Sequence, residues 1–467
     1  MDIGLIGLAV MGQNLVLNME RNGYSVGVYN RTASKTEEFM KHRAEGKKIK
    51  PSWSIQELVN MLKRPRKVMI MVKAGKPVDD NMEELLKYLE PGDIIIDGGN
   101  SHFTDTKRRY KELTGKGILF LGTGVSGGEE GALKGPCIMP GGQEKAYEEV
   151  KDIFFKIAAQ VDNIPCCNYI GSEDSGHFVK MVHNGIEYAD MELIAEAYDF
   201  LKKGLRMSVE EIREIFLKWK DSDLNSYLID ITVDVLAAID EETGKPMVDV
   251  ILDKAEQKGT GKWTSQAALD LGMPVSVIDT AVFVRNMSSF KKERVEASKI
   301  LKGPAREFKG DRSHIIEAVY DSLLCSKITS YAQGMALLHS ASKSYNYNLK
   351  LNEIAQIWKG GCIIRAGLLE PIRQAYLKNP DLSNLYRDDN FNKILNDKQD
   401  NWRFIVSEGI LMGIPCPATA SSLQYYDCYR AERLPANLLQ AQRDYFGAHT
   451  FERIDREGTF HREWIAK

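Results

Sequence analysis

The 467-residue sequence lacks the features that mark membrane-spanning, secreted and strongly charged proteins. It contains no apolar run of the roughly 20 residues that cross a bilayer as a helix, and no basic segment followed by an apolar one at its start. Neither sign of charge is in excess, since 62 Lys and Arg face 65 Asp and Glu. We therefore expect no membrane, no secretory signal and no nucleic-acid partner. An anionic ligand must be held by locally gathered basic side chains.

Cysteine is scarce and scattered. The seven thiols form an odd set without the short spacings of metal sites, and the eight histidines do not cluster with them. Their positions are Cys137, Cys166, Cys167, Cys325, Cys362, Cys416 and Cys428. We expect reduced thiols in a cytoplasmic protein, and no metal site.

The first 174 residues alternate short β-rich runs with helical patterns. Several of the runs are continuously apolar, as in a parallel sheet that is covered on both faces. The predicted strands are Ile3–Leu8, Ser25–Asn30, Lys67–Val72, Asp93–Asp97 and Ile118–Gly122. Strands separated by helices predict βαβ units, and so an α/β, Rossmann-like domain over residues 1–174.

The rest of the chain has a different texture. Helical periodicity dominates from residue 175 to residue 433, which predicts a large all-helical second domain. Residues 434–467 are rich in aromatic and charged side chains and end without a long helical pattern. We interpret them as a C-terminal tail that packs on its own subunit or on a partner.

A glycine-rich turn follows the first predicted strand. Gly7, Ala9 and Gly12 form the pattern G-x-A-x-x-G, with a helical pattern directly after it. The first glycine permits the tight turn, the small second residue lets a pyrophosphate approach the backbone, and the third allows close helix–strand packing. The context of strand, turn and helix favours a dinucleotide site, with the phosphates at the N-terminus of the helix.

The end of the second predicted strand indicates which dinucleotide binds. An acidic residue there would bind the ribose 2′-hydroxyl of NAD, but this chain has Asn30, Arg31 and Thr32, with Lys35 nearby. A guanidinium forms charge-assisted hydrogen bonds with a phosphate, so we predict NADP. The alternative is that Arg31 is a solvated surface charge.

Two later strand ends should lie beside the same crevice, because ligands bind outside the carboxyl ends of strands in an open α/β sheet. Val72, Lys73 and Ala74 close one strand, and Asn100 follows another. The Asn100 side chain can both donate and accept hydrogen bonds near the nicotinamide ribose.

Four polar residues recur at helical spacing in the second domain. Lys180, His183, Asn184 and Glu187 occupy positions i, i+3, i+4 and i+7, which place them on one face of a helix. That spacing normally marks the apolar stripe that faces a core. A base and an acid on one buried face suit proton transfer to and from a bound substrate. The alternative is an ordinary stripe that faces solvent.

Two further glycine-rich segments are candidates for substrate contacts. Ser126, Gly127 and Gly128 follow the fifth predicted strand and present a hydroxyl and backbone amides. The segment Lys258–Lys262 resembles a fragment of a phosphate loop, but its spacing is incomplete and excludes an ATP site of that kind.

With these residues in view, the chain resembles the decarboxylating, NADP-dependent 6-phosphogluconate dehydrogenases over its whole length. The segments that carry the resemblance are Gly7–Gly12, Asn30–Thr32, Asp97–Ser101, Gly124–Glu129, Gly176–Tyr188, Gln257–Trp263 and Arg443–His449. The resemblance implies oxidative decarboxylation of 6-phosphogluconate to ribulose 5-phosphate. It also implies a homodimer in which Arg443 and His449 of the tail reach the active site of the other subunit.

The resemblance assigns roles to individual residues. Lys180 matches the general base and Glu187 the general acid. Substrate contacts are implied for Asn100, Ser126, Gly127, Gly128, His183, Asn184, Tyr188, Lys258, Arg285, Arg443 and His449. Among them, Tyr188, Lys258 and Arg285 match contacts to the substrate phosphate. Cofactor contacts are implied for Gly7, Leu8, Ala9, Val10, Met11, Gly12, Asn30, Arg31, Thr32, Val72, Lys73, Ala74 and Asn100.

Three alternatives remain open at this point. The chain could be another β-hydroxyacid dehydrogenase, a noncatalytic NADP-binding scaffold, or an NAD-preferring enzyme for the same reaction. Intact Lys180 and Glu187 argue against the scaffold, and Arg31 argues against NAD. The sequence has no obvious carboxylate cluster for a divalent metal, so we predict a metal-independent decarboxylation.

Overall fold

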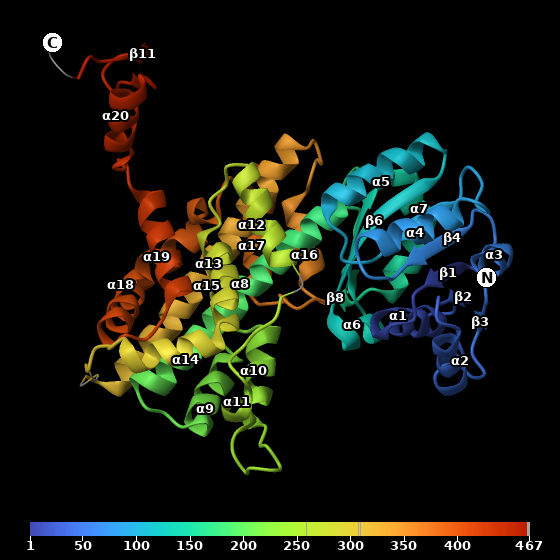
Figure 1. Cartoon of the computed structure of the whole chain (residues 1–467), viewed down its shortest axis with the longest axis horizontal. Helices are drawn as coiled ribbons and strands as arrows, with labels where there is room; N and C mark the ends of the chain where they lie inside the picture. Colours follow the sequence, from blue (N-terminus) through green and yellow to red (C-terminus); the bar gives the residue numbers. More distant parts are fainter. Residues whose placement is uncertain (258, 307, 309, 465–467) are drawn as a thin grey trace. The chain divides into compact units, whose positions relative to one another are not determined.

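The computed structural model describes residues 1–257, 259–306, 308 and 310–464 (Figure 1). By its contacts the chain divides into two compact units, Met1–Ser422 and Leu423–Lys467. The larger unit contains a sheet with its flanking helices and a large helical region. None of the described helices combines the length and apolar composition needed to cross a bilayer.

A seven-stranded sheet forms the N-terminal part, with strand order β3-β2-β1-β4-β5-β6-β7. Its strands are β1 (Ile3–Ile6), β2 (Val26–Tyr29), β3 (Ile49–Pro51), β4 (Lys67–Ile70), β5 (Ile94–Asp97), β6 (Leu119–Ser126) and β7 (Cys137–Gly142). The order reverses at β1, which places a topological switch point between β1 and β4. The predicted Rossmann-like fold followed by a helical domain is confirmed.

Both faces of the sheet are buried because successive apolar side chains point to opposite sides. In β5, Ile94 and Ile96 join one core cluster and Ile95 joins the other. The first cluster packs against α1 (Val10–Arg21), α2 (Ala33–His42) and α7 (Glu144–Ile157). The second packs against α3 (Ile55–Asn60), α4 (Lys76–Leu85) and α5 (Phe103–Gly115). This double coverage explains why the strands read as continuous apolar runs.

The far edge of the sheet differs from the prediction. Strand β6 continues to Ser126 rather than ending at Gly122, because it pairs antiparallel with β7 as far as Ser126 opposite Cys137. The predicted glycine-rich loop is therefore strand as far as Ser126, and Gly127 and Gly128 open the short helix α6 (Gly128–Lys134). Strands β3 and β7 were not predicted, since both contain proline and β7 ends in two glycines.

Helices make up most of the remainder of the larger unit. They are α8 (Ser175–Gly204), α9 (Val209–Trp219), α10 (Tyr227–Ala237), α11 (Met247–Val250), α12 (Thr260–Asp270), α13 (Ser276–Ser289), α14 (Lys291–Ile300), α15 (Arg312–Ser344), α16 (Leu351–Trp358), α17 (Leu369–Lys378), η1 (Leu385–Arg387) and α18 (Asp389–Met412). A two-stranded ribbon, β8 (Gln160–Val161) and β9 (Ile164–Pro165), precedes them. Helix α19 (Pro417–Arg430) begins in the larger unit and ends in the smaller one. The long helices α8 and α15 pack against each other and form the centre of this region.

Helix α8 also packs directly on the sheet, against β6 and β7. The approach is close because glycines face one another. A Cβ atom at Gly176 of α8 would lie 2.3 Å from the carbonyl oxygen of Gly122, and one at Gly141 would lie 2.3 Å from the Gly176 nitrogen. The first turns of α8 are thereby held against the carboxyl end of β6.

The smaller unit contains α20 (Ala436–Gly447) and an antiparallel pair, β10 (Phe451–Glu452) and β11 (Thr459–Phe460). Asp444 is fully buried and organises it. Its carboxylate accepts hydrogen bonds from the Thr450 and Arg462 backbone amides, from the Trp464 indole at 2.8 Å and from His461 at 2.8 Å. Asp444 is thus saturated with donors, which fixes the turn after α20.

Candidate active site

The four polar residues of α8 converge as a buried group. Lys180 is 7% exposed and His183 is 0% exposed, while Asn184 and Glu187 are partly buried. The ammonium of Lys180 donates to Asn184 Oδ1, and His183 Nδ1 lies 3.0 Å from the same oxygen. An amide oxygen only accepts, so Nδ1 carries the imidazole hydrogen and Nε2 is left as an acceptor. The stripe therefore faces inward, and the solvent-facing alternative is wrong.

Neighbouring elements complete this group. Ser126 Oγ, at the end of β6, lies 3.4 Å from His183 Nε2. The Asn184 amide donates to Thr260 Oγ1 at 3.1 Å, at the first residue of α12. The His183 ring also meets Trp358 edge-on, with ring centroids 5.7 Å apart. Strand β6 and helices α12 and α16 thus each bring one polar group or ring to the polar stripe of α8.

Lys180 is positioned by a glycine of the sheet. A Cβ atom at Gly124 would lie 2.4 Å from Lys180 Cβ and 2.9 Å from its Cγ. Only a residue without a side chain lets the lysine stem lie against β6. The segment around Gly124 is glycine-rich in the sequence, but local pattern does not show that this glycine contacts the lysine.

Burial shifts the pKa values of Lys180 and Glu187 in the directions that favour the neutral amine and the neutral carboxyl group. Burial lowers the pKa of Lys180, and the electrostatic influence of Glu187, Cys362 and Cys137 opposes that shift only in part. Burial raises the pKa of Glu187, against the opposing effect of Lys180 and Arg285. A neutral amine can accept a proton and a neutral carboxyl can donate one, so the pair suits acid–base chemistry.

The pKa of His183 is lowered well below its ordinary value by burial and by the charge of Lys180. Its Nδ1 lies 3.9 Å from Glu187 Oε2, but a neutral imidazole makes this a contact rather than an ion pair. His183 is therefore placed to orient a ligand through hydrogen bonds rather than to carry charge.

The predicted dinucleotide turn is built as its sequence requires. Gly7 has φ +105°, and a Cβ atom there would lie 2.4 Å from the Met71 carbonyl oxygen. The Leu8 amide donates to Asn30 Oδ1 at 3.0 Å, so Asn30 braces the turn from the end of β2. Ala9 is the N-cap of α1, and Val10, Met11 and Gly12 form its first turn. The positive end of α1 is thus directed at the space outside this turn.

A cavity of about 630 Å³ lies beside the turn. The predicted cofactor residues that line it are Gly7, Asn30, Arg31, Thr32, Val72 and Lys73, together with Lys35. Arg31 and Lys35 are exposed, and neither has an ion-pair partner among the described residues. A cavity with a helix N-terminus and two unpaired cations fits a dinucleotide that carries an additional phosphate. Ala74 and Asn100 lie in the loops after β4 and β5.

Tyr188, one of the predicted phosphate contacts, directly follows Glu187 on α8. The Arg285 guanidinium of α13 stacks on the Tyr188 ring at 3.6 Å, and its only other contact among the described residues is with Met191 Sδ at 3.4 Å. This cation has no carboxylate partner within ion-pair distance in the described part of the chain. Lys258, the third predicted phosphate contact, lies outside the described residues.

Arg443 and His449 belong to the smaller unit. Arg443 lies on α20 and donates to Gln440 Oε1 at 3.0 Å, and His449 follows the end of that helix. Both side chains are exposed. The larger unit brings together the other predicted substrate residues that the structure describes, apart from Asn100, Gly127 and Gly128, for which no hydrogen bond to the α8 stripe is seen among the described residues.

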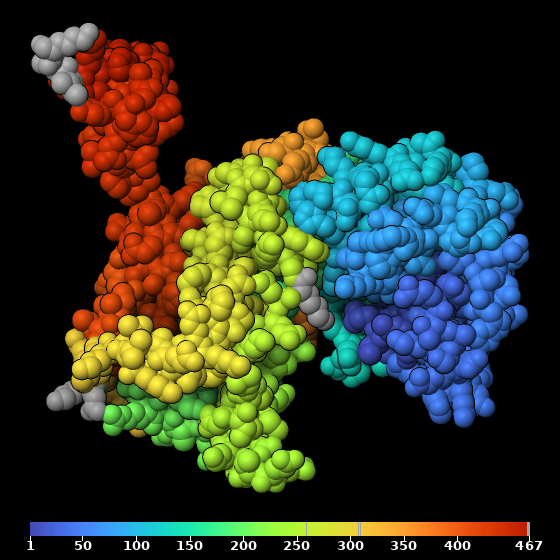
Figure 2. Space-filling model, viewed as in Figure 1, coloured from blue at the N-terminus to red at the C-terminus, as the bar shows by residue number. Residues whose placement is uncertain are grey.

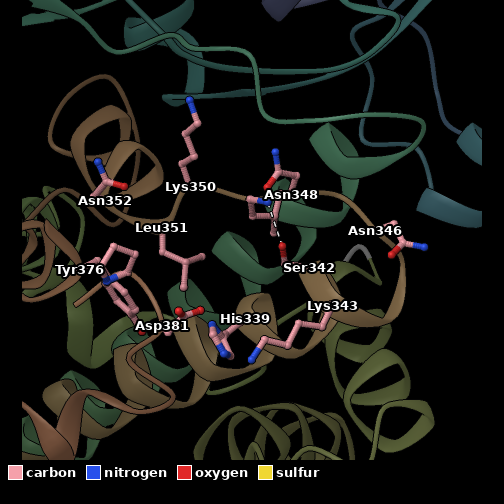
Figure 3. Close-up of a pocket in the computed structure, with 12 residues that line it drawn as sticks. His339, Ser342, Lys343, Asn346, Asn348, Lys350, Leu351, Asn352, Tyr376 and Asp381 are labelled. Atoms are coloured by element: carbon pink, nitrogen blue, oxygen red, sulfur yellow. Dashed lines mark hydrogen bonds between the residues drawn. The ribbon is translucent and has the colours of Figure 1, made fainter.

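A second cavity, of about 500 Å³, lies between α15, α16 and α17 (Figure 3). It is lined by residues such as His339, Lys343 and Asn348, and by none of the predicted site residues. Within the part of the chain that the structure describes, no group of three or more His, Cys, Asp or Glu side chains is arranged to hold a metal ion.

Comparisons with known proteins cover the chain from end to end. Residues 2–171 match the family profile of the NAD binding domain of 6-phosphogluconate dehydrogenase, and residues 176–464 match that of its C-terminal domain. A 6-phosphogluconate dehydrogenase, decarboxylating, from Synechococcus elongatus is 57% identical over 99% of both chains. A Bacillus subtilis protein named 6-phosphogluconate dehydrogenase, NADP(+)-dependent, decarboxylating, is 56% identical, also over 99% of both chains.

A solved structure agrees with the sequence comparisons. The Plasmodium falciparum 6-phosphogluconate dehydrogenase, described in apo form and in complexes with NADP+ and with 6-phosphogluconate, is 46% identical. It superimposes with a TM-score of 0.96 over 99% of this chain and 100% of its own.

Proposed function

The chain belongs to the 6-phosphogluconate dehydrogenase family, and on that premise we propose that it converts 6-phospho-D-gluconate to D-ribulose 5-phosphate and CO₂ while reducing NADP⁺ to NADPH. The observation that carries the proposal is the α8 stripe. Lys180 is buried without a carboxylate in hydrogen-bond contact among the described residues, and it shares one face of α8 with the partly buried Glu187. Their opposite pKa shifts supply a base and an acid on one rigid element.

Lys180 acts first, as a base. The neutral amine takes the proton of the substrate 3-hydroxyl as C3 loses its hydride, and NADP⁺, when bound, accepts that hydride. Burial of Lys180 provides the neutral form that this step needs. Asn184 and His183 hold the amine and the substrate hydroxyls in place through hydrogen bonds.

The same residues then serve the second step. The 3-keto acid loses CO₂, and protonated Lys180 stabilises the negative charge that develops on the C3 oxygen. Lys180 gives its proton to that oxygen to form the enediol, and takes it back as Glu187 protonates the carbon that lost CO₂, which becomes C1 of the ketose. Burial raises the pKa of Glu187, which favours the protonated form that this step needs. Because Lys180 supplies the cation at the carbonyl, we propose that no divalent metal is required.

The phosphate of the substrate would lie at Arg285 and Tyr188. The guanidinium has no carboxylate partner among the described residues, and stacking on the ring fixes its orientation. Lys258 is proposed as a further cation of this pocket. At the other end, Ser126 and the amides of Gly127 and Gly128 would hold the carboxylate and hydroxyls, together with Asn100.

The assay that tests the reaction mixes purified protein with 6-phosphogluconate and NADP⁺ in excess chelator. We expect equal amounts of NADPH, CO₂ and ribulose 5-phosphate. Activity that vanishes in chelator and returns with a divalent metal would contradict metal independence alone. An absence of all three products, with and without metal, would contradict the reaction.

NADP preference rests on Arg31 and Lys35 in the dinucleotide cavity. Arg31→Ala should lower kcat/KM for NADP⁺ about tenfold or more, and leave kcat/KM for NAD⁺ nearly unchanged, because only the 2′-phosphate loses a charge-assisted bond. Lys41→Ala is the matched control. Lys41 is an exposed cation on α2, the helix that follows Arg31 and carries Lys35, and it does not line the cavity. Equal losses with both cofactors would contradict this role.

We further propose a homodimer whose tails complete the active sites. The larger unit exposes apolar side chains on α13 and α14, which lie on the face drawn in Figure 2. They are Phe283, Met287, Phe290, Val295 and Ile300. The smaller unit exposes another apolar set: Leu438, Leu439, Phe446 and Ile454. Exposed apolar patches usually mark association surfaces. Arg443 and His449, the two predicted substrate contacts of the tail, are also exposed.

Mixing two inactive variants tests tail exchange. Arg443→Ala and Lys180→Arg homodimers should each be nearly inactive at low substrate, but refolding them together should restore about a quarter of wild-type activity. Half of the randomly mixed dimers then carry one intact site each. No recovery would contradict a tail that acts in the partner subunit.

The proposed organisation is a cofactor domain (1–174), a helical domain (175–433) and a tail (434–467). A cytoplasmic location is proposed because all seven cysteines are free thiols and six are buried.

A further inference from the structure

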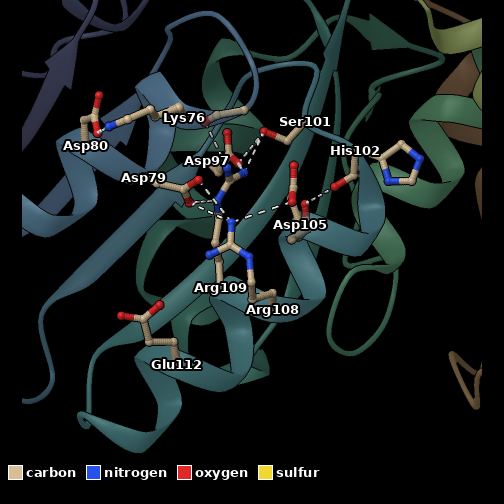
Figure 4. Close-up of polar contacts among 12 residues, drawn as sticks. Lys76, Asp79, Asp80, Asp97, Ser101, His102, Asp105, Arg108, Arg109 and Glu112 are labelled. Carbon is tan, nitrogen blue, oxygen red and sulfur yellow. Dashed lines mark hydrogen bonds and ion pairs between the residues drawn. The ribbon is translucent and has the colours of Figure 1, made fainter.

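An arginine lies buried at the carboxyl edge of the sheet, outside the residues discussed so far. The Arg109 side chain of α5 is 1% exposed, and Figure 4 shows it between Asp79 on one side and Asp97 with Ser101 on the other. Its Nε donates to Asp79 Oδ1 at 2.7 Å, and its Nη1 donates to Asp97 Oδ2 at 3.1 Å. Nη1 is also 3.2 Å from Ser101 Oγ, and Nη2 donates to the Gly75 carbonyl at 3.1 Å.

These partners lie in or beside the two loops that flank the dinucleotide crevice. Gly75 ends the loop between β4 and α4, and Asp79 lies in the first turn of α4. Asp97 is the last residue of β5, and Ser101 lies in the loop after it, which also contains Asn100. Asp97 in turn holds its own loop, because it accepts from the Gly99 amide at 3.2 Å and from the Ser101 hydroxyl at 2.6 Å. One guanidinium therefore fixes the separation of the two loops.

Stability alone is a poor explanation for this arrangement. Burying a guanidinium and a carboxylate costs several kcal/mol, and well-packed apolar residues often stabilise a core at least as well. A planar guanidinium does what apolar residues do not: it fixes several oxygens at set distances and directions. The geometry thus favours a positional role.

The same helix is also tied to the catalytic helix. Thr106, one turn before Arg109 on α5, lies 2.7 Å from His177 Nδ1 in the first turn of α8. Both side chains are buried. Helix α5 therefore holds the cofactor loops at its Arg109 and contacts the helix of Lys180 at its Thr106.

We propose that Arg109 is a positioning residue that holds the Val72–Gly75 and Asp97–Ser101 loops at the spacing needed to bind the nicotinamide half of NADP⁺. Arg109 acts through these loops and contacts neither ligand. The inference rests on the proposed function, because it takes the cofactor to lie between the two loops.

The test compares Arg109→Lys with Arg108→Lys. Lysine keeps the charge but loses the fork that reaches four partners, so Arg109→Lys should raise the KM for NADP⁺ about tenfold, with a smaller fall in kcat, since small misplacements of binding groups are costly. The KM for 6-phosphogluconate should change less than the KM for NADP⁺. Arg108 is the matched control: it is the adjacent residue, is 51% exposed and contacts the same Asp79 at 2.9 Å. Its lysine variant should bind NADP⁺ like the wild type.

Each outcome is decisive. A folded Arg109→Lys protein with wild-type affinity for NADP⁺, or one that only melts at a lower temperature, overturns the proposal. If that variant does not fold, Ser101→Ala decides, since it keeps the ion pair and removes one hydroxyl from the network; it should raise the KM for NADP⁺ about threefold, by the loss of roughly one hydrogen bond. Wild-type protein that fails to bind NADP⁺ would overturn the proposed function and this inference together.

Discussion

Two lysines are buried among the described residues of the larger unit, and only one of them has a carboxylate partner. Lys327 of α15 is fully buried with Asp190 of α8, and its ammonium lies 2.6 and 2.8 Å from the two carboxylate oxygens and 3.2 Å from Ser226 Oγ. Lys180 lies about three helical turns before Asp190 on α8, and its only hydrogen-bond partner among the described residues is the Asn184 amide oxygen.

The difference separates a lysine that pairs with a carboxylate from the lysine that we propose as a base. Burial removes water from both ammonium groups, but a hydrogen-bonded carboxylate compensates Lys327. At Lys180 the nearest acid is Glu187, which burial itself drives toward the neutral form. The pKa of Lys180 is consequently lowered, and a proton acceptor results. Helix α8 carries both arrangements because Asp190, near its middle, meets Lys327 of α15, while its first turns pack on the sheet.

Lys180→Arg should have the largest effect, because it removes the proposed base from the unpaired lysine position. Arginine keeps the positive charge but cannot serve as a base, so kcat should fall about 10³- to 10⁴-fold, the upper part of the usual contribution of a general base. The measurement is steady-state NADPH formation, with dissociation constants for both ligands as the control for folding. Turnover near the wild-type level would remove Lys180 from its role.

Lys327→Met tests the opposite lysine. It leaves Asp190 buried and unpaired, so the free energy of unfolding should fall by about 3–5 kcal/mol. Adding Asp190→Leu in the same chain should restore most of that loss, because the uncompensated charge is gone. Urea unfolding followed by circular dichroism measures both. An unchanged unfolding midpoint in the single variant would show that this pair does not stabilise the fold.

Glu187→Gln sharpens the comparison through pH. Loss of the general acid should lower kcat about 10²-fold. The charge of Glu187 raises the pKa of Lys180, so its removal should lower that pKa further. The rising limb of the pH profile, where Lys180 loses its proton, should therefore move to lower pH. A limb that stays in place or moves to higher pH would show that Glu187 does not act on Lys180.

Gly124→Ala should have the smallest effect. The added Cβ would lie 2.4 Å from Lys180 Cβ, so the lysine stem must shift, and kcat should fall about tenfold. Gly115→Ala is the control, since a Cβ there meets nothing within 4 Å. If both variants keep wild-type kcat, the contact with β6 does not position Lys180.

Much of the architecture could be predicted from local pattern. Strands β1, β2, β4 and β5 lie within their predicted ranges, because continuous apolar runs between helical patterns are specific to a covered parallel sheet. Strand β7 could not be predicted, since Cys137–Gly142 contains a proline and two glycines and is held in place by its pairing with β6. The Arg109 network gave no signal either, because an arginine in an amphipathic helix normally faces solvent.

The sequence by itself determined which polar residues share one helix face and where the glycine turn lies. Helical spacing puts Lys180, His183, Asn184 and Glu187 on one face, and Gly7 permits the turn before α1. Only the tertiary structure decided that this face is buried and which lysine lacks a carboxylate. Periodicity follows from the backbone of a single helix, whereas pairing and desolvation depend on which other elements lie against it. Here those elements are β6, whose Gly124 leaves space for the Lys180 side chain, and α15, whose Lys327 forms an ion pair with Asp190.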